Sequence, residues 1–225
     1  MNNKPPQAAT PAVRIQQNIL ARGERRVLNW ICARLPQWVS PDQLTTLGFL
    51  GAVMVAMGYM LSWLNPAWLA LSITGYVVNW FGDSLDGSLA RWRRIERPSY
   101  GYFVDHSVDG MATLLMVGSI GLSPYMRFDV ALLGVIGYLL LSIHSFLAAK
   151  VVGEFRLSYM AGGPTELRLM LMTMTALMPV IGGADVNGTN FSPFDLFGLV
   201  ISSILVTLFV TQSFATARTL AHRGD

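Results

Sequence analysis

Four aspartates with regular spacing are the residues of this chain best suited to chemistry. Asp83 and Asp86 are three residues apart and Asp105 and Asp109 are four apart, so each pair shares one face of a helix. Four carboxylates in one small space repel strongly, since two unit charges 4 Å apart interact by ~4 kcal/mol at an effective dielectric of about 20. Mg²⁺ or Mn²⁺ offsets such repulsion and also binds phosphate. Four carboxylates would match two metal ions.

The segments that carry these aspartates are long and apolar. The chain is 52% hydrophobic and 13% charged, whereas a soluble domain carries about 25% charged residues. A membrane-spanning helix needs roughly 20 mostly apolar residues. Six stretches qualify: 44–64, 66–82, 101–122, 128–149, 167–184 and 194–214. We therefore predict an all-α integral membrane protein with six transmembrane helices.

The aspartates fall where two of these spans meet the membrane edge. One pair follows the span 66–82 and the other begins the span 101–122. The two helices are consecutive and joined by a short loop, so we expect them to be antiparallel neighbours with all four acids at one depth. Any single Asp here could be a helix cap or a loop charge, but intramembrane ionisable residues are costly and indicate function.

Basic residues predict the orientation of the spans. An even number of spans places both termini on one side of the membrane. Fifteen of the sixteen Lys and Arg residues fall on that side, and Arg127 is the exception. The positive-inside rule makes this side cytoplasmic. We expect a multi-pass protein whose termini and aspartate cluster face the cytoplasm.

The N-terminal part has a different character. Residues 1–13 are rich in Pro, Ala and Gln and are predicted to be disordered. Residues 14–35 combine apolar residues with several arginines in the manner of an amphipathic helix. This pattern indicates a helix lying on an anionic membrane surface. A helix packed on the bundle is the alternative. A single membrane domain, 14–225, would contain the transmembrane bundle, 44–214.

Small and basic residues accompany the aspartates. Gly87 and Ala90 would let a ligand or another backbone approach closely, although small residues also serve helix packing in membranes. Arg91 follows them and Gly101 precedes the second pair.

Together these residues resemble the CDP-alcohol phosphotransferase (CDP-alcohol phosphatidyltransferase) family. Its motif is D-x-x-D-G-x-x-A-R, then eight or nine residues, then G-x-x-x-D-x-x-x-D. The fixed positions are all filled here, by Asp83, Asp86, Gly87, Ala90, Arg91, Gly101, Asp105 and Asp109. The motif covers 27 residues, and the six-span layout extends the resemblance to most of the chain.

The resemblance implies roles for these residues. Asp83, Asp86 and Asp105 would hold metal, and Asp109 would be a further ligand or the base that deprotonates the acceptor hydroxyl. The cytidine and pyrophosphate of a CDP-linked donor would lie beside the smaller motif residues and the arginine, namely Gly87, Ala90, Arg91 and Gly101. The implied partners are that donor, an alcohol acceptor and membrane lipid, and family members are often homodimers.

A second resemblance is to the eukaryotic choline and ethanolamine phosphotransferases. Their D-H-x-x-D and G-P-x-E segments match Asp105-His106-Ser-Val-Asp109 and Gly163-Pro164-Thr165-Glu166. This likeness implies His106 as an alternative base, and its ordinary pKa range suits that role. A hydrogen-bonded His at a wet helix end is the other interpretation. Possible acceptor or phosphate contacts are Glu166, Arg156 and Arg168.

The predicted function is transfer of a substituted phosphate group from a CDP-linked donor to an alcohol in phospholipid synthesis, with release of CMP. Two versions stay open: CDP-diacylglycerol with a small polar alcohol, or a CDP-aminoalcohol with a lipid alcohol. A divalent-cation transporter is the alternative from another class, although these carboxylates lie at helix ends on one side only. An inactive relative is a third. No nucleic-acid partner is expected, and the single cysteine, Cys32, excludes an internal disulfide.

Overall fold

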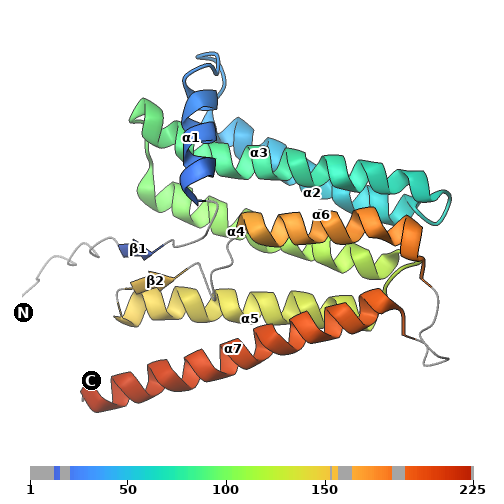
Figure 1. The fold of residues 1–225 in the computed structure, drawn as a ribbon. Coiled ribbons are helices and arrows are strands. Elements are labelled where there is room, and N and C mark those ends of the chain that lie inside the picture. Colours follow the sequence, from blue (N-terminus) through green and yellow to red (C-terminus); the bar gives the residue numbers. More distant parts are fainter. Residues whose placement is uncertain (1–12, 16–20, 153, 157–163, 184–190, 224–225) are drawn as a thin grey trace, which may run out of the picture.

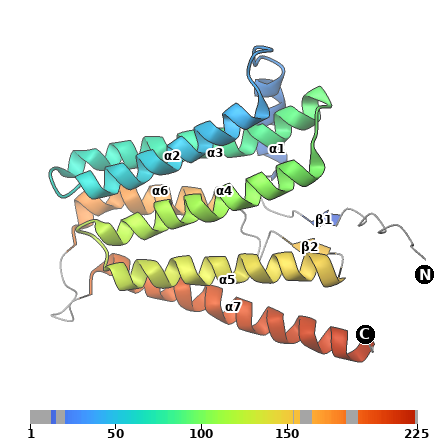
Figure 2. The same cartoon turned by 180° about the vertical axis from the view of Figure 1, so that it is seen from behind.

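Six long helices lie side by side and form the body of the protein (Figures 1 and 2). The structure is a computed structural model that describes residues 13–15, 21–152, 154–156, 164–183 and 191–223. The long helices are α2 (Pro41–Leu61), α3 (Leu69–Arg93), α4 (Pro98–Gly118), α5 (Phe128–Val152), α6 (Pro164–Ile181) and α7 (Pro193–Arg223). Between them lie two 3₁₀ turns, η1 (Pro66–Trp68) and η2 (Ser119–Leu122).

The short helix α1 (Ala21–Cys32) lies across one end of the bundle. At that end α2, α4 and α6 begin and α3, α5 and α7 end, and we call it the α1 end. Leu28 and Cys32 are buried in a cluster with Leu85 and Leu89 of α3, while Trp30 on the other face is exposed. Helix α1 therefore packs on the bundle through one face and leaves an aromatic face outward.

The predicted amphipathic helix 14–35 was wrong at its start. Residues Val13–Ile15 form strand β1, which pairs in parallel with strand β2 (Glu154–Arg156) in the register Val13 to Glu154. Backbone hydrogen bonds to a distant segment override a local apolar pattern that is weak over so few residues. The predicted disorder of residues 1–13 lies outside the described residues except for Val13.

The helices match the six predicted apolar segments but extend beyond several of them. Helix α3 continues to Arg93 and α7 to Arg223, because a helix continues through charged residues that a hydropathy criterion excludes. Three helices, α2, α5 and α7, are long and apolar enough to cross a membrane. In α3, α4 and α6 the polar and charged side chains lower the mean hydropathy.

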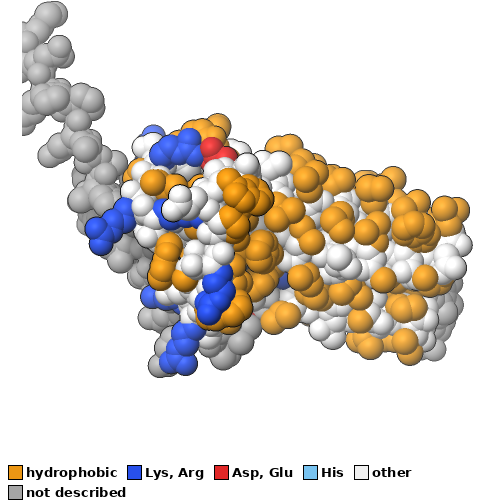
Figure 3. Space-filling model, turned by 90° about the horizontal axis from the view of Figure 1, so that it is seen from above, with side chains coloured by type: hydrophobic (Ala, Val, Ile, Leu, Met, Phe, Trp, Pro, Cys, Tyr) orange, Lys and Arg blue, Asp and Glu red, His pale blue; other side chains and the backbone are white. Residues whose placement is uncertain are grey.

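The surface is divided along the length of the bundle. Hydrophobic side chains cover the long body, and Lys and Arg gather at one end (Figure 3). Among the described side chains, only Arg127 provides a basic group at the far end, immediately before α5. This distribution follows the one that membranes impose on spanning bundles.

Glycines bring α2 and α3 into backbone contact. A Cβ on Gly82 would lie 2.3 Å from the backbone nitrogen of Gly48, and one on Gly51 would lie 2.4 Å from that of Asn79. Small residues allow such close approach of helices in membranes. The start of α2 is set by Ser40, which forms a capping box with Gln43. These contacts align the first turns of α2 with Asp83 and Asp86.

We expect Gly82→Ala to lower the stability of the protein by about 1–3 kcal/mol, because the added methyl group must push α2 away from α3. Thermal unfolding in detergent would measure this change. Gly23→Ala is the matched control, since a Cβ on Gly23 would meet no described atom within 4 Å beyond its own helix backbone. Equal unfolding temperatures for the two variants would contradict the close approach of the helices.

Candidate active site

All four aspartates line one small cavity near the α1 end. Its volume is about 10 Å³, and Thr45 and Gly48 of α2 are among the other lining residues. That is roughly the space of one water molecule. The structure thus brings together the two pairs, Asp83 and Asp86 on α3 with Asp105 and Asp109 on α4, at one level.

Helix α2 joins the two acid-bearing helices. It packs against both α3 and α4, whereas α3 and α4 barely contact each other directly. The two helices run antiparallel, as expected, and share the small cavity, but their backbones make few direct contacts. The physical reason is that the glycine face of α3, at Gly75 and Gly82, is already filled by α2, which leaves space between the carboxylates of α3 and α4.

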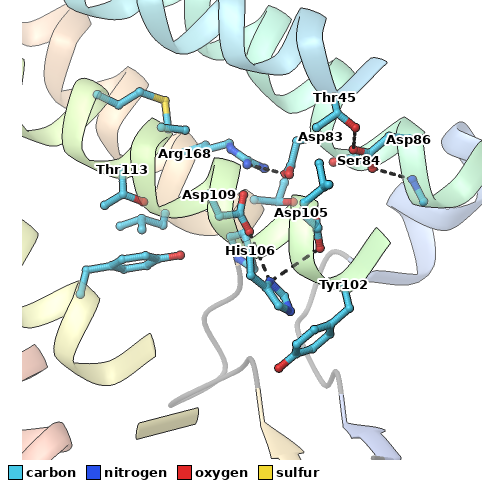
Figure 4. Close-up of a pocket in the computed structure, with 18 of the residues that line it drawn as sticks. Thr45, Asp83, Ser84, Asp86, Tyr102, Asp105, His106, Asp109, Thr113 and Arg168 are labelled. Atoms are coloured by element: carbon cyan, nitrogen blue, oxygen red, sulfur yellow. Dashed lines mark hydrogen bonds and ion pairs between the residues drawn. The ribbon is translucent and has the colours of Figure 1, made fainter. Parts of the chain in front are cut away.

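The carboxylates of α3 have different partners. Arg168 of α6 donates from Nη2 to Asp83 Oδ2 over 2.5 Å, with side-chain exposures of 11% and 23% (Figure 4). Thr45 donates from Oγ1 to Asp86 Oδ2 over 2.6 Å, and the backbone N–H of Gly87 donates to Asp86 Oδ1. Asp83 therefore carries an ion pair within reach of the cavity, whereas Asp86 is held by neutral donors.

On α4, His106 lies between the two acids. Its Nδ1 is 3.7 Å from Asp105 Oδ2 and 3.9 Å from Asp109 Oδ2. The imidazole packs edge-on against Tyr102, with ring centroids 4.4 Å apart, and its centroid is 5.0 Å from that of Phe146 on α5. These aromatic contacts restrict the ring beside both carboxylates, at separations longer than a hydrogen bond.

The cluster fits a divalent metal. Ligand atoms of Asp105, His106 and Asp109 all lie within 4.8 Å of one another, and the small cavity adds Asp83 and Asp86. Ionised carboxylates offer only acceptor oxygens, which hard cations such as Mg²⁺ and Mn²⁺ prefer. The residues present could therefore hold such an ion, and their roles as ligands stay a prediction.

A second, much larger cavity opens beside the acids. Its volume is about 2050 Å³, beyond the 300–1,000 Å³ of usual small-molecule sites. Around its polar end lie Gly87, Ala90, Arg91, Gly101 and Arg168 with the four aspartates and His106. A Cβ on Gly101 would meet no described atom within 4 Å beyond its own helix backbone, so packing does not explain the absence of a side chain there.

The same cavity has an apolar arm. It extends among α4, η2, α5, α6 and α7 toward the far end of the bundle, and its apolar lining includes Met116, Ile120, Leu171, Met174, Ile201 and Leu205. Asp109 and Ile120 are eleven residues apart, and at 1.5 Å per residue that is about 16 Å along a helix. One cavity therefore joins a charged end to an apolar channel of alkyl-chain length.

An ion pair stands at the mouth of the large cavity. Arg97, just before α4, pairs with Asp42 in the first turn of α2, and both residues line the cavity. The hydrogen bond to Asp42 raises the pKa of the Arg97 guanidinium. Arg97 therefore places a guanidinium in the wall of the large cavity, and its partner is Asp42, which is not one of the four clustered aspartates.

Glu24 connects α1 to the site. Its Oε1 accepts hydrogen bonds from Trp80 Nε1 at 2.9 Å, Thr165 Oγ1 at 2.8 Å and Ser84 Oγ at 3.4 Å. Ser84 follows Asp83 directly, and Thr165 lies one helical turn before Arg168. A single carboxylate thus fastens α1 to the parts of α3 and α6 that carry the Asp83–Arg168 pair.

We expect Glu24→Ala to lower stability by about 1–3 kcal/mol, because three donors lose one charged acceptor. The unfolding temperature in detergent measures the effect. Arg26→Ala, an exposed change on the same helix, is the control and should leave that temperature unchanged. A Glu24→Ala protein as stable as wild type would show that α1 is held by its apolar face alone.

One of the predicted contacts, Glu166, lines neither cavity. It lies in the first turn of α6. Arg156 belongs to β2, and its side chain lies outside the described residues, as does Gly163. Sequence reasoning missed Thr45 and Glu24, whose residue types and spacing carry no signal of their own.

Comparison with known proteins identifies relatives. Residues 38–210 match the model of the CDP-alcohol phosphatidyltransferase family. The chain is 25% identical over 190 residues to cholinephosphotransferase 1 of Danio rerio, covering 76% of this chain and 48% of that protein. It is 28% identical over 116 residues to archaetidylinositol phosphate synthase of Pyrococcus horikoshii, covering 52% and 58%.

A third relative is CDP-diacylglycerol–serine O-phosphatidyltransferase of Encephalitozoon cuniculi. The identity is 29% over 143 residues, covering 60% of this chain and 36% of that protein. The chain spans between about a third and three fifths of the length of these curated relatives. The matched residues 38–210 contain every aspartate of the cluster.

Proposed function

The chain belongs to the CDP-alcohol phosphatidyltransferase family, and from this premise we propose that it transfers a substituted phosphate group from a CDP-linked donor to an alcohol in phospholipid synthesis, releasing CMP. The observation that carries the proposal is one continuous cavity with the four aspartates at its polar end and an apolar arm behind them. Such a cavity suits a reaction in which one partner is polar and the other is a lipid.

The acids are proposed to hold two divalent ions, Mg²⁺ or Mn²⁺, through Asp83, Asp86, Asp105 and Asp109. Bound there, the ions would neutralise charge on the pyrophosphate of the donor. The small residues Gly87, Ala90 and Gly101 leave room for the cytidine and pyrophosphate. Arg91 lies on the same wall and is proposed to stabilise the charge on departing CMP.

Proton transfer is assigned to Asp109. It accepts the proton of the acceptor hydroxyl as that oxygen forms a bond to the β-phosphorus, and the bond between the β-phosphorus and the CMP oxygen breaks. His106, whose Nδ1 lies 3.9 Å from Asp109, is the second candidate for the base. Catalysis of this kind is mostly positioning and charge neutralisation.

All six long helices are proposed to cross the membrane, with the α1 end and both termini in the cytoplasm. The basic end of the surface (Figure 3) supports this orientation. Helix α1 would then lie at the membrane surface with Trp30 toward lipid, and Arg34 stacks on that ring with its guanidinium carbon 4.0 Å from the ring centroid. The homodimer implied by the resemblance stays a prediction.

Within the family reaction, a CDP-aminoalcohol donor and a lipid alcohol acceptor are favoured. The Asp105-His106 pair and the Pro164–Glu166 segment support this version, as does the similarity to a cholinephosphotransferase. The second version, CDP-diacylglycerol with a small polar alcohol, is supported by Arg168. Its guanidinium lies beside the acids in the cavity and would pair with the phosphate of an anionic acceptor.

A panel of donors decides between the two versions. Purified protein in detergent receives CDP-choline, CDP-ethanolamine or CDP-diacylglycerol, each with lipid and polar alcohols and Mn²⁺ or Mg²⁺, and CMP is measured. We expect CMP only when donor, acceptor and metal are all present, with a CDP-aminoalcohol as the better donor. Uptake of metal into vesicles without CMP release from any donor would support cation transport instead.

A further inference from the structure

Asn79 has a buried side-chain amide whose nitrogen has a hydrogen-bond partner among the described residues and whose oxygen has none. It lies on α3 with 3% of its surface exposed. Its Nδ2 donates to the backbone carbonyl of Gly48 on α2 over 3.0 Å. Its Oδ1 is buried and has no hydrogen-bond partner among the residues that the structure describes. Buried polar atoms almost always have a partner, so we expect this oxygen to have one beyond the described residues of the chain.

The position of Asn79 indicates what that partner is. Asn79, Asp83 and Asp86 are spaced i, i+4 and i+7 on α3, which places them on one helix face. Asn79 also lines the small cavity of about 10 Å³ that all four aspartates share. The hydrogen bond to Gly48 fixes the amide nitrogen toward that carbonyl of α2, so the oxygen, on the other branch of the planar amide, points away from it.

The cavity is rich in acceptors. Ionised carboxylates and the Asn79 oxygen accept hydrogen bonds and donate none. A hydrated cation held among the aspartates, which also line the large cavity, can satisfy these acceptors, because Mg²⁺ and Mn²⁺ keep several bound waters. A cation bound by the aspartates alone, without a water that reaches Asn79, would leave the Asn79 oxygen without a partner among the described residues.

We infer that Asn79 is a further residue of the metal centre, its Oδ1 accepting a hydrogen bond from a water bound to the cation. The inference rests on the proposed metal-dependent function and extends it to a residue outside the family motif. Asn79 is a positioning residue, since it acts on the ion through water. Partners of this kind typically change metal affinity by about 10- to 100-fold.

Metal affinity tests the inference without any need for turnover. Mn²⁺ is titrated into the purified protein in detergent, and free Mn²⁺ is followed by electron paramagnetic resonance. We expect Asn79→Leu, which removes the oxygen at similar volume, to raise the Mn²⁺ dissociation constant by about 10- to 100-fold. Asn79→Asp keeps an oxygen at this position and should bind Mn²⁺ at least as tightly as wild type.

Ser72→Ala is the matched control for the loss of a hydrogen bond between α3 and α2. Ser72 lies seven residues earlier on the same face of α3, and its Oγ donates to the backbone carbonyl of Val55 on α2 over 2.9 Å. The control removes the same kind of α3-to-α2 bond away from both cavities. It should leave the Mn²⁺ dissociation constant unchanged.

The outcomes separate this inference from the proposed function. If wild type binds Mn²⁺ and Asn79→Leu binds it equally well, the oxygen contacts only a trapped water and the inference is wrong. The inference is also wrong if Asn79→Asp or Ser72→Ala loses as much affinity as Asn79→Leu. Should the leucine variant not fold, a folded Asn79→Asp protein that binds Mn²⁺ about 10-fold or more weakly than wild type overturns the inference. If wild type binds no Mn²⁺, or Asp86→Asn binds it as wild type does, the proposed metal site itself fails.

Discussion

Asp86→Asn is expected to reduce CMP release by about 1000-fold while the protein remains folded. Asp86 is 9% exposed, and its carboxylate accepts from Thr45 and from the N–H of Gly87. The asparagine oxygen can keep the Thr45 bond. The new NH₂ group, however, places a donor where the cavity needs an acceptor, and the negative charge is lost. Initial rates with saturating donor, acceptor and Mn²⁺ measure the effect.

Asp129→Asn is the control for this experiment. Asp129 is an exposed carboxylate at the far end of the bundle, paired with Arg127, and its replacement should leave the rate unchanged. The unfolding temperature of both variants shows whether they fold. An Asp86→Asn protein that is folded and retains more than about a tenth of the wild-type rate would exclude Asp86 from the catalytic machinery.

The second large effect is expected at Arg168. Its guanidinium pairs with Asp83 at the cavity wall, where the phosphates of a bound donor or acceptor would lie. Charge-assisted hydrogen bonds contribute about 1.5–3 kcal/mol. We therefore expect Arg168→Ala to lower kcat/KM by roughly 10- to 100-fold, since 1.36 kcal/mol corresponds to a tenfold change in rate. Arg168→Lys should restore only part of it, because an ammonium group lacks the planar fork of donors.

Arg127→Ala removes a matched ion-paired arginine from the far end and should not change kcat/KM. If Arg168 contacts the substrate phosphate, the loss appears mainly as a higher KM for the anionic substrate. A loss confined to the unfolding temperature would instead show that Arg168 serves only to hold α6 against α3.

Much of the site was predictable because its spacing is local. Asp83 and Asp86, like Asp105 and Asp109, share helix faces by their intervals alone, and the apolar segments around them placed both pairs at one level. Arg168 was a candidate only through its charge beside a predicted span. The structure adds that it pairs with Asp83, across 85 residues of sequence, which no local pattern encodes.

The remaining features depend on tertiary packing. Helix α2 lies between the two acid-bearing helices because its glycines pack against those of α3. The sequence shows that these glycines are present but not which of them are in contact. Thr45 reaches Asp86 because α2 packs against α3, and Glu24 reaches α3 and α6 because α1 packs at their ends. Asn79 did carry a signal that was missed, because it is an amide within an apolar span one turn before Asp83. The pairing of β1 with β2 is likewise a long-range contact.

The central claim is that the four aspartates jointly bind divalent cation next to the CDP-linked donor. Anomalous diffraction from crystals of the protein grown with Mn²⁺ and a CDP-alcohol tests it most directly. We expect manganese peaks among Asp83, Asp86, Asp105 and Asp109, with the pyrophosphate beside them. Manganese elsewhere, or α3 and α4 carboxylates too far apart to share an ion, would contradict it.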